Sequence, residues 1–319
     1  MPPNPPRPPL THFLCLPLVT ESSRPHLQES LVQFTSRINS LNFNVREEKD
    51  ILPEQAVRPL GTLHLTIGVM SLKTQEALDG ALKLLGELDV DKLLREAGED
   101  ARNKTVGGNQ TQRGKAPATD SLNTKGSSSV STRAPRPTAA DRLQDSSANF
   151  LYNPSKPNPR TPSPRPISTT ATQPSTQGPL TVSLHGLHPM HKPNSTSILY
   201  ANPQDKTSRL HPFCTCLRSI FQSSSYVLPD DRPLLLHITI FNTIYASSGS
   251  QSHGHGKGRK GKWMIDASQI LKDFGEYDWM SNVRVEKIAI CEMGAKKIRD
   301  KRGNIIAEEY TEVGYKKLV

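Results

Sequence analysis

The amino-acid sequence predicts an α+β fold made of two similar lobes, and three observations support this prediction. Two matching strings, Leu63–Ile67 and Leu236–Ile240, each place a histidine two residues before a threonine, among aliphatic residues. In each half of the chain, strand and helix patterns precede this string, which indicates a weak internal duplication. A long segment without hydrophobic periodicity, residues 101–178, separates the two halves.

The first half begins with a proline-rich stretch, residues 1–10, which we expect to be a disordered lead-in. Hydrophobic periodicity then predicts a strand over 11–19, a helix from Ser22 or Ser23 to about Asn39, the first histidine strand over about 61–70 and a helix from 74 to about 97. Gly86 and the aspartates after it favour a break in the last helix. We assign residues 11–100 to a first lobe.

The second half resumes at Leu180, and we assign residues 179–319 to a second lobe of the same domain. Its predicted elements are strands over about 180–187 and 197–202, a helix over about 205–224, the second histidine strand over about 234–245, a short helix over 267–273 and closing strands over about 283–291 and 305–316.

The segment between the lobes carries most of the excess charge. Residues 101–178 hold eleven Lys or Arg and three Asp, so +8 of the net charge of +10 falls there. This Ser-, Thr- and Pro-rich composition cannot bury enough apolar surface to offset the entropy of ordering, so we expect a long disordered insertion. Because the charge is not on a folded groove, it does not by itself predict sequence-specific nucleic-acid binding.

Several classes of protein are not indicated by the sequence. No apolar run approaches the roughly 20 residues of a membrane-spanning helix, and no secretory signal is present, so we expect a nuclear or cytoplasmic protein without a membrane partner. The chain has no Walker loop, no Rossmann glycine pattern and no zinc-helix motif. We expect neither a metal nor another cofactor. The four cysteines are predicted to be reduced thiols in apolar surroundings: Cys15, Cys214, Cys216 and Cys291.

The two histidine strings predict a phosphate chemistry. Residues i and i+2 of a strand share a face, so His64 and Thr66 point one way, and His237 and Thr239 repeat this arrangement. Cleaving a phosphodiester requires one oxygen to be deprotonated and another protonated, and a pair of imidazoles can do both near neutral pH. Hydroxyl donors stabilise the charge on the other phosphoryl oxygens. Two such strands facing each other would surround one small ligand.

The motifs resemble those of the 2H phosphoesterase superfamily, which is LigT-like or 2′-5′ RNA ligase-like and is marked by two H-x-T/S motifs. Within it, the chain is similar to the domain shared by kinase-A anchoring proteins and a transcription coactivator subunit, in its fungal form. The resemblance covers about 11–98 and 179–319. It is carried by Phe13–Leu18, Arg58–Leu72, Leu235–Tyr245 and Ile288–Ala295.

This resemblance implies a bilobal fold with a central cleft. It implies that His64 and His237 are the acid/base pair and that Thr66 and Thr239 donate to phosphate oxygens. The implied substrates are RNA-derived 2′,3′-cyclic phosphates, 2′-5′ linkages or small nucleotide diesters. Which histidine is the acid and which is the base stays open.

Two residues after the second motif are candidates for substrate binding, Asn242 and Tyr245. Asn242 falls outside the His/Thr alternation, so a regular strand would turn it to the opposite face. Hydrogen bonding at the strand end is therefore its favoured role.

The leading hypothesis is a monomeric, metal-independent phosphodiesterase that acts on an RNA end or a small nucleotide. Two alternatives remain open. The first is a non-catalytic nucleotide- or RNA-binding subunit of a transcription or RNA-processing complex. The second is a scaffold that acts through residues 101–178.

Overall fold

Two antiparallel sheets of four strands each form the framework of the computed structural model, which describes residues 8–43, 51–107, 178–246 and 263–318. The first sheet has the order β10-β7-β1-β2 and consists of β1 (His12–Pro17), β2 (His64–Met70), β7 (Lys287–Glu292) and β10 (Glu312–Lys317). The second has the order β5-β4-β3-β6 and consists of β3 (Thr181–Pro189), β4 (Ile198–Gln204), β5 (Ile238–Asn242) and β6 (Asp278–Arg284).

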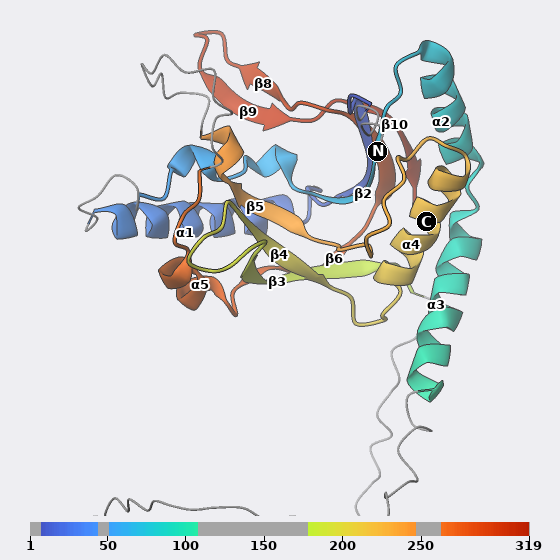
Figure 1. The fold of residues 1–319 in the computed structure, drawn as a ribbon, viewed down its shortest axis with the longest axis horizontal. Coiled ribbons are helices and arrows are strands. Elements are labelled where there is room, and N and C mark those ends of the chain that lie inside the picture. The colour runs from blue at the N-terminus through green and yellow to red at the C-terminus, as the bar shows by residue number, and fades with distance from the viewer. Residues whose placement is uncertain (1–7, 44–50, 108–177, 247–262, 319) are drawn as a thin grey trace, which may run out of the picture. The chain divides into compact units, whose positions relative to one another are not determined.

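The remaining elements connect and cover these sheets. The α-helices of the described residues are α1 (Arg24–Asn42), α2 (Gln75–Glu87), α3 (Val90–Gly107), α4 (Leu210–Ser223) and α5 (Ser268–Phe274). Short 3₁₀ turns are η2 (Glu54–Ala56), η3 (Leu60–Thr62) and η4 (Thr243–Tyr245). A separate hairpin, β8 (Lys296–Arg299) and β9 (Ile305–Glu309), extends away from the two sheets (Figure 1).

The two sheets confirm the predicted α+β fold with two similar halves. Each histidine strand is an edge strand, β2 in the first sheet and β5 in the second. Helix α1 connects β1 to β2, and α4 connects β4 to β5. The connecting helices are exchanged, since α1 contacts β6 of the second sheet and α4 contacts β2 of the first.

Apolar packing explains why α1 lies on the second sheet. Its buried stripe includes Phe34, whose ring meets the rings of Phe274 and Trp279 edge-on, with centroids 5.1 and 5.4 Å apart. Ser30 on the same face donates a hydrogen bond to the Trp279 carbonyl at 3.0 Å. Most buried side chains of both sheets therefore belong to one continuous hydrophobic cluster, and Phe13, Cys15, Ala289 and Cys291 of the first sheet form a second one.

Strand pairing differs from the predicted division into consecutive lobes. Residues of the predicted second lobe, in β7 and β10, extend the first sheet, because β7 pairs with β1 and β10 pairs with β7. The predicted strand over 283–291 is also two strands, β6 and β7, which belong to different sheets. Pairing between strands far apart in the chain leaves no local pattern, so the sequence did not indicate it.

Capping side chains set several helix ends. The predicted helix from 74 to about 97 is broken into α2 and α3, and the Asp89 carboxylate accepts the Lys92 amide hydrogen at 2.9 Å to begin α3. Helix α4 begins later than predicted, because the Asp205 carboxylate accepts the amide hydrogens of Arg209 and Leu210.

Two predicted segments, the insertion and the proline-rich lead-in, lie partly outside the described residues. Helix α3 continues to Gly107, so the first part of the predicted insertion is helical. The rest of that insertion, 108–177, and the first residues of the proline-rich lead-in are outside the description, as are residues 247–262.

Backbone pairing joins each half to the histidine strand of the other. The Arg58 amide donates to the Ile240 carbonyl of β5 at 2.8 Å, and the Leu228 amide donates to the Val69 carbonyl of β2 at 2.9 Å. Bridges between Val57 and Phe241 and between Met70 and Val227 accompany these bonds. The segment before each histidine strand thus pairs with the free edge of the other histidine strand.

Substitution of Gly68 in β2 tests this contact between the halves. A Cβ added there would lie 2.5 Å from a methyl group of Val227. We expect Gly68→Ala to lower the free energy of unfolding by about 1–3 kcal/mol in urea titrations, and Gly68→Ala/Val227→Ala to recover part of this loss. Gly86→Ala in α2, where a Cβ meets open space, is the matched control and should be neutral or stabilising. Unchanged stability of Gly68→Ala would contradict the contact.

Candidate active site

All six residues that the sequence singled out line one pocket of about 200 Å³. The pocket lies where β2 and β5 approach each other, and both halves contribute to it. Its lining residues are Phe13, Arg58, Thr62, His64, Thr66, Val69, His237, Thr239, Asn242, Tyr245, Met293 and Tyr310. The structure therefore brings both His-x-Thr motifs to one site.

Each histidine strand presents its polar residues through the alternation of a strand. His64 and Thr66 are partly exposed while Leu65 and Ile67 are buried, and His237 and Thr239 show the same alternation with Ile238 and Ile240, as the sequence predicted.

A β-bulge follows each motif and changes the face of the next residues. Cys15 pairs with Thr66 while Leu14 pairs with Gly68, so Ile67 is the extra residue of β2. In β5 the pairing skips Ile240 in the same way, because Tyr200 opposes Thr239 and Leu199 opposes Phe241. An extra residue reverses the alternation of the residues that follow it.

The bulge at Ile240 places Asn242 on the face of β5 opposite to the one that a regular strand predicts. A regular strand would turn Asn242 away from His237, but the bulge at Ile240 brings it to the pocket, as the bulge at Ile67 brings Val69. Asn242 also has the expected strand-end hydrogen bond, since its side-chain oxygen accepts the Ile244 amide hydrogen at 3.1 Å.

A backbone carbonyl fixes the tautomer of each histidine. His64 Nδ1 lies 2.8 Å from the carbonyl oxygen of Thr62, and His237 Nδ1 lies 3.0 Å from that of Leu235. A carbonyl can only accept, so Nδ1 carries the proton in both rings. The other ring nitrogen, Nε2, of each neutral imidazole is then a free base.

The two histidines differ in their surroundings. The His64 ring packs against those of Phe13 and Tyr310, with centroid distances of 4.7 and 5.2 Å, and these two rings also touch each other. The His237 ring meets the edge of one aromatic ring, that of Tyr200 on β4, at 5.5 Å.

Burial lowers the pKa of His64 to about 4, and the nearby positive charges of Arg58 and His237 act in the same direction. The hydrogen bond to the Thr62 carbonyl opposes this effect only in part. His64 is therefore a neutral imidazole at pH 7.

Two important residues of the pocket were not predicted as site residues. Arg58 is 4% exposed, its guanidinium carbon lies 3.7 Å from the centre of the Tyr245 ring, and its Nη2 lies 3.4 Å from the Tyr310 hydroxyl. Burial raises the pKa of the Tyr310 phenol to about 12, so it stays protonated. An arginine beside the first motif was a signal for Arg58. Tyr310 lies between β9 and β10, where no pattern indicated a site.

The charge of the pocket suits an anion. Its described lining contains Arg58 and two histidines but no Asp or Glu. Groups of three or more His, Cys, Asp or Glu side chains that could hold a metal ion are absent from the described ranges. Within the same ranges, none of the helices combines the length and hydropathy that crossing a bilayer requires.

Two edge strands that each carry a His-x-Thr motif into one shared pocket define a protein of the 2H phosphoesterase class. A family model described as "AKAP7 2'5' RNA ligase-like domain" matches residues 10–308, and the chain belongs to this family. This confirms the resemblance seen in the sequence.

The individual proteins that resemble this chain share only low sequence identity with it. The chain is 27% identical over 135 residues to "Uncharacterized protein C15D4.13c" of Schizosaccharomyces pombe (strain 972 / ATCC 24843), which covers 42% of this chain and 57% of that protein. The match thus spans a little over half of the relative's length. Two similar solved structures are a phosphoesterase (14% identity, TM-score 0.40) and E. coli LigT complexed with 3′-AMP (13% identity, TM-score 0.39). Each alignment covers 98% of this chain and 99% of the other.

The ionisation of His64 can be measured directly. In long-range ¹H–¹⁵N spectra, we expect His64 to carry its proton on Nδ1 at pH 7 and to titrate with a pKa of about 4. Phe13→Ala should raise this pKa toward 6.5, because water then reaches one face of the ring. A titration of the wild type with a midpoint at or above 6.5 would show that the ring is not buried as described.

Proposed function

We propose that this protein is a 2H-type phosphodiesterase that breaks RNA-derived 2′,3′-cyclic phosphates or 2′-5′ linkages by metal-independent acid/base catalysis. The observation that carries the proposal is the convergence of His64, Thr66, His237 and Thr239 on one pocket whose described lining has no carboxylate. The family description supports RNA-derived substrates.

His64 is the base in the direction of hydrolysis. Its low pKa and its Nδ1–H bond to Thr62 leave Nε2 with a free lone pair at pH 7. This nitrogen takes the proton of the attacking water as the oxygen bonds to phosphorus. His237 enters the step as an imidazolium: its Nδ1–H bonds to the Leu235 carbonyl, and its Nε2–H gives the proton to the leaving ribose oxygen.

The two threonines stabilise the non-bridging oxygens of the phosphoryl group, which neither gain nor lose a proton in the reaction. As water adds to phosphorus, negative charge builds on the non-bridging oxygens. The hydroxyls of Thr66 and Thr239 come from the same strand faces as the two imidazoles and donate hydrogen bonds to these oxygens. Asn242 at the end of β5 and Tyr245 in η4 contact the rest of the nucleotide.

Localisation in the nucleus or cytoplasm, a monomeric state and a place in a transcription or RNA-processing complex stay predictions. The scaffold hypothesis concerns residues 101–178, of which 108–177 lie outside the described structure.

Substitution of the four motif residues tests the proposed catalysis. With 2′,3′-cyclic nucleotides and 2′-5′ oligoadenylates in EDTA, we expect His64→Ala and His237→Ala to lower kcat/KM by about 10²- to 10⁴-fold. Thr66→Val and Thr239→Val should each lower it by about 10²-fold. His185→Ala is the matched control, because His185 lies outside the pocket and pairs with Asp278 and Glu276.

Activity that is unchanged in both pocket-histidine variants would refute the proposal. Nucleotide affinity without product in the wild type would instead favour the non-catalytic binding subunit.

The pH dependence of kcat/KM separately tests His64 as the base. A base with a pKa of about 4 loses activity only as the pH falls through that value, because protonation then removes its lone pair. We expect the acidic limb of the profile to have its midpoint near this pH, with circular dichroism confirming that the protein remains folded. A midpoint near 6.5, the ordinary imidazole value, would contradict this assignment.

A further inference from the structure

Arg58 is a buried positive charge without an ionic partner among the described residues. Its side chain is 4% exposed, and its contacts are the Tyr310 hydroxyl at 3.4 Å and the Tyr245 ring at 3.7 Å. A guanidinium stays charged at physiological pH, and the phenol of Tyr310 is neutral. Burying a charge is costly unless an opposite charge compensates it. Most of its five N–H donors also remain available to a ligand.

The pairing between the two halves does not require an arginine at this position. The Arg58 amide donates to the carbonyl of Ile240, the bulge residue of β5, and the Leu228 amide donates to the carbonyl of Val69, two residues after the bulge of β2. Each bond joins a main-chain N–H to a main-chain carbonyl, and a leucine makes the second one, so neither bond needs a guanidinium. Because main-chain atoms alone make this contact between the halves, the contact does not explain why a guanidinium is buried here.

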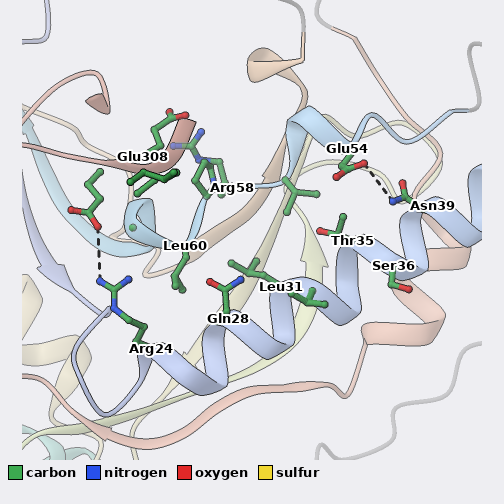
Figure 2. Close-up of a pocket in the computed structure, with 17 residues that line it drawn as sticks. Arg24, Gln28, Leu31, Thr35, Ser36, Asn39, Glu54, Arg58, Leu60 and Glu308 are labelled. Atoms are coloured by element: carbon green, nitrogen blue, oxygen red, sulfur yellow. Dashed lines mark hydrogen bonds and ion pairs between the residues drawn. The ribbon is translucent and has the colours of Figure 1, made fainter. Parts of the chain in front are cut away.

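Arg58 lies between two pockets of opposite charge character. A wider pocket of about 670 Å³, between α1, the 54–61 segment and β9, is shown in Figure 2. Besides Arg58, its charged lining consists of three carboxylates and one arginine that pairs with Glu309 at 3.9 Å: Glu54, Glu308, Glu309 and Arg24. The histidine pocket has no carboxylate in its described lining. An anion is therefore favoured on the histidine side.

The contacts of the guanidinium also lie on the histidine side. Tyr245 and Tyr310, which it touches, line the histidine pocket and are not part of the lining of the wider one. The positive end of Arg58 is thus held among the residues that surround His64 and His237.

We propose that Arg58 binds the substrate's phosphoryl group in the histidine pocket, where it provides the permanent positive charge that neither threonine supplies. This assignment rests on the proposed phosphodiesterase function. The negative charge of the phosphoryl group compensates the buried guanidinium. Tyr245 and Tyr310 hold the guanidinium in place without neutralising it.

Calorimetry with AMP and adenosine tests this role, because the two ligands differ only in the phosphate. Neither ligand contains a phosphodiester bond, so both are measured with the wild-type protein as the parent and no turnover interferes. We expect Arg58→Gln to weaken AMP binding by about 10- to 100-fold and to leave adenosine binding unchanged. Arg58→Lys, which keeps the charge and serves if Arg58→Gln does not fold, should give a smaller loss confined to AMP.

The matched control is Arg37→Gln, since Arg37 is paired with Asp273 on α5 and lines neither pocket. It should bind AMP as the parent protein does. Equal losses for AMP and adenosine in both Arg58 variants would mean that Arg58 only shapes the pocket, and would overturn the assignment. So would unchanged AMP affinity in Arg58→Gln, or no AMP affinity in the parent.

Turnover separates this assignment from the proposed function. If the wild type cleaves no diester while Arg58→Gln loses AMP affinity, the phosphodiesterase function fails and the phosphate site stands. If the wild type cleaves diesters and Arg58→Gln binds AMP normally, the Arg58 assignment alone fails.

Discussion

Two backbone hydrogen bonds set the geometry on which the rest of the site depends. The Arg58 amide bonds to Ile240, and the Leu228 amide bonds to Val69, so each half holds the histidine strand of the other. Edge strands have unpaired N–H and C=O groups, and here those groups face the opposite half. Because both His-x-Thr motifs lie on these edges, the same pairing that joins the halves brings their polar faces to one pocket.

The site is symmetric in its backbone and asymmetric in its chemistry. Each half has the same order of strand, helix and histidine strand, with an isoleucine bulge after the threonine and a carbonyl behind the imidazole. The surroundings then divide the roles. Burial and the nearby positive charge of Arg58 lower the pKa of His64, whose ring packs against those of Phe13 and Tyr310. In the proposed reaction, this difference in burial and charge keeps His64 unprotonated at pH 7 and thereby gives it the role of the base.

Local pattern predicted the features that depend on neighbouring residues in the chain. The fold class, the two histidine strands, α1 and the six candidate residues all followed from periodicity, motif and resemblance. The exchange of α1 and α4, and the addition of β7 and β10 to the first sheet, depend on contacts between distant segments. For the same reason Tyr310 was not predicted. Asn242 was placed on the wrong face because a bulge has no sequence signature as clear as alternation.

The central claim is that His64 and His237 act together on one phosphodiester. The most direct test is the kinetics of the double variant His64→Ala/His237→Ala beside each single variant, with one 2′,3′-cyclic nucleotide. If both imidazoles serve the same step, the double variant should lose about as much kcat/KM as the worse single variant, because removing either one already disables the pair. Losses that multiply would mean that the two histidines act independently, and would contradict the account.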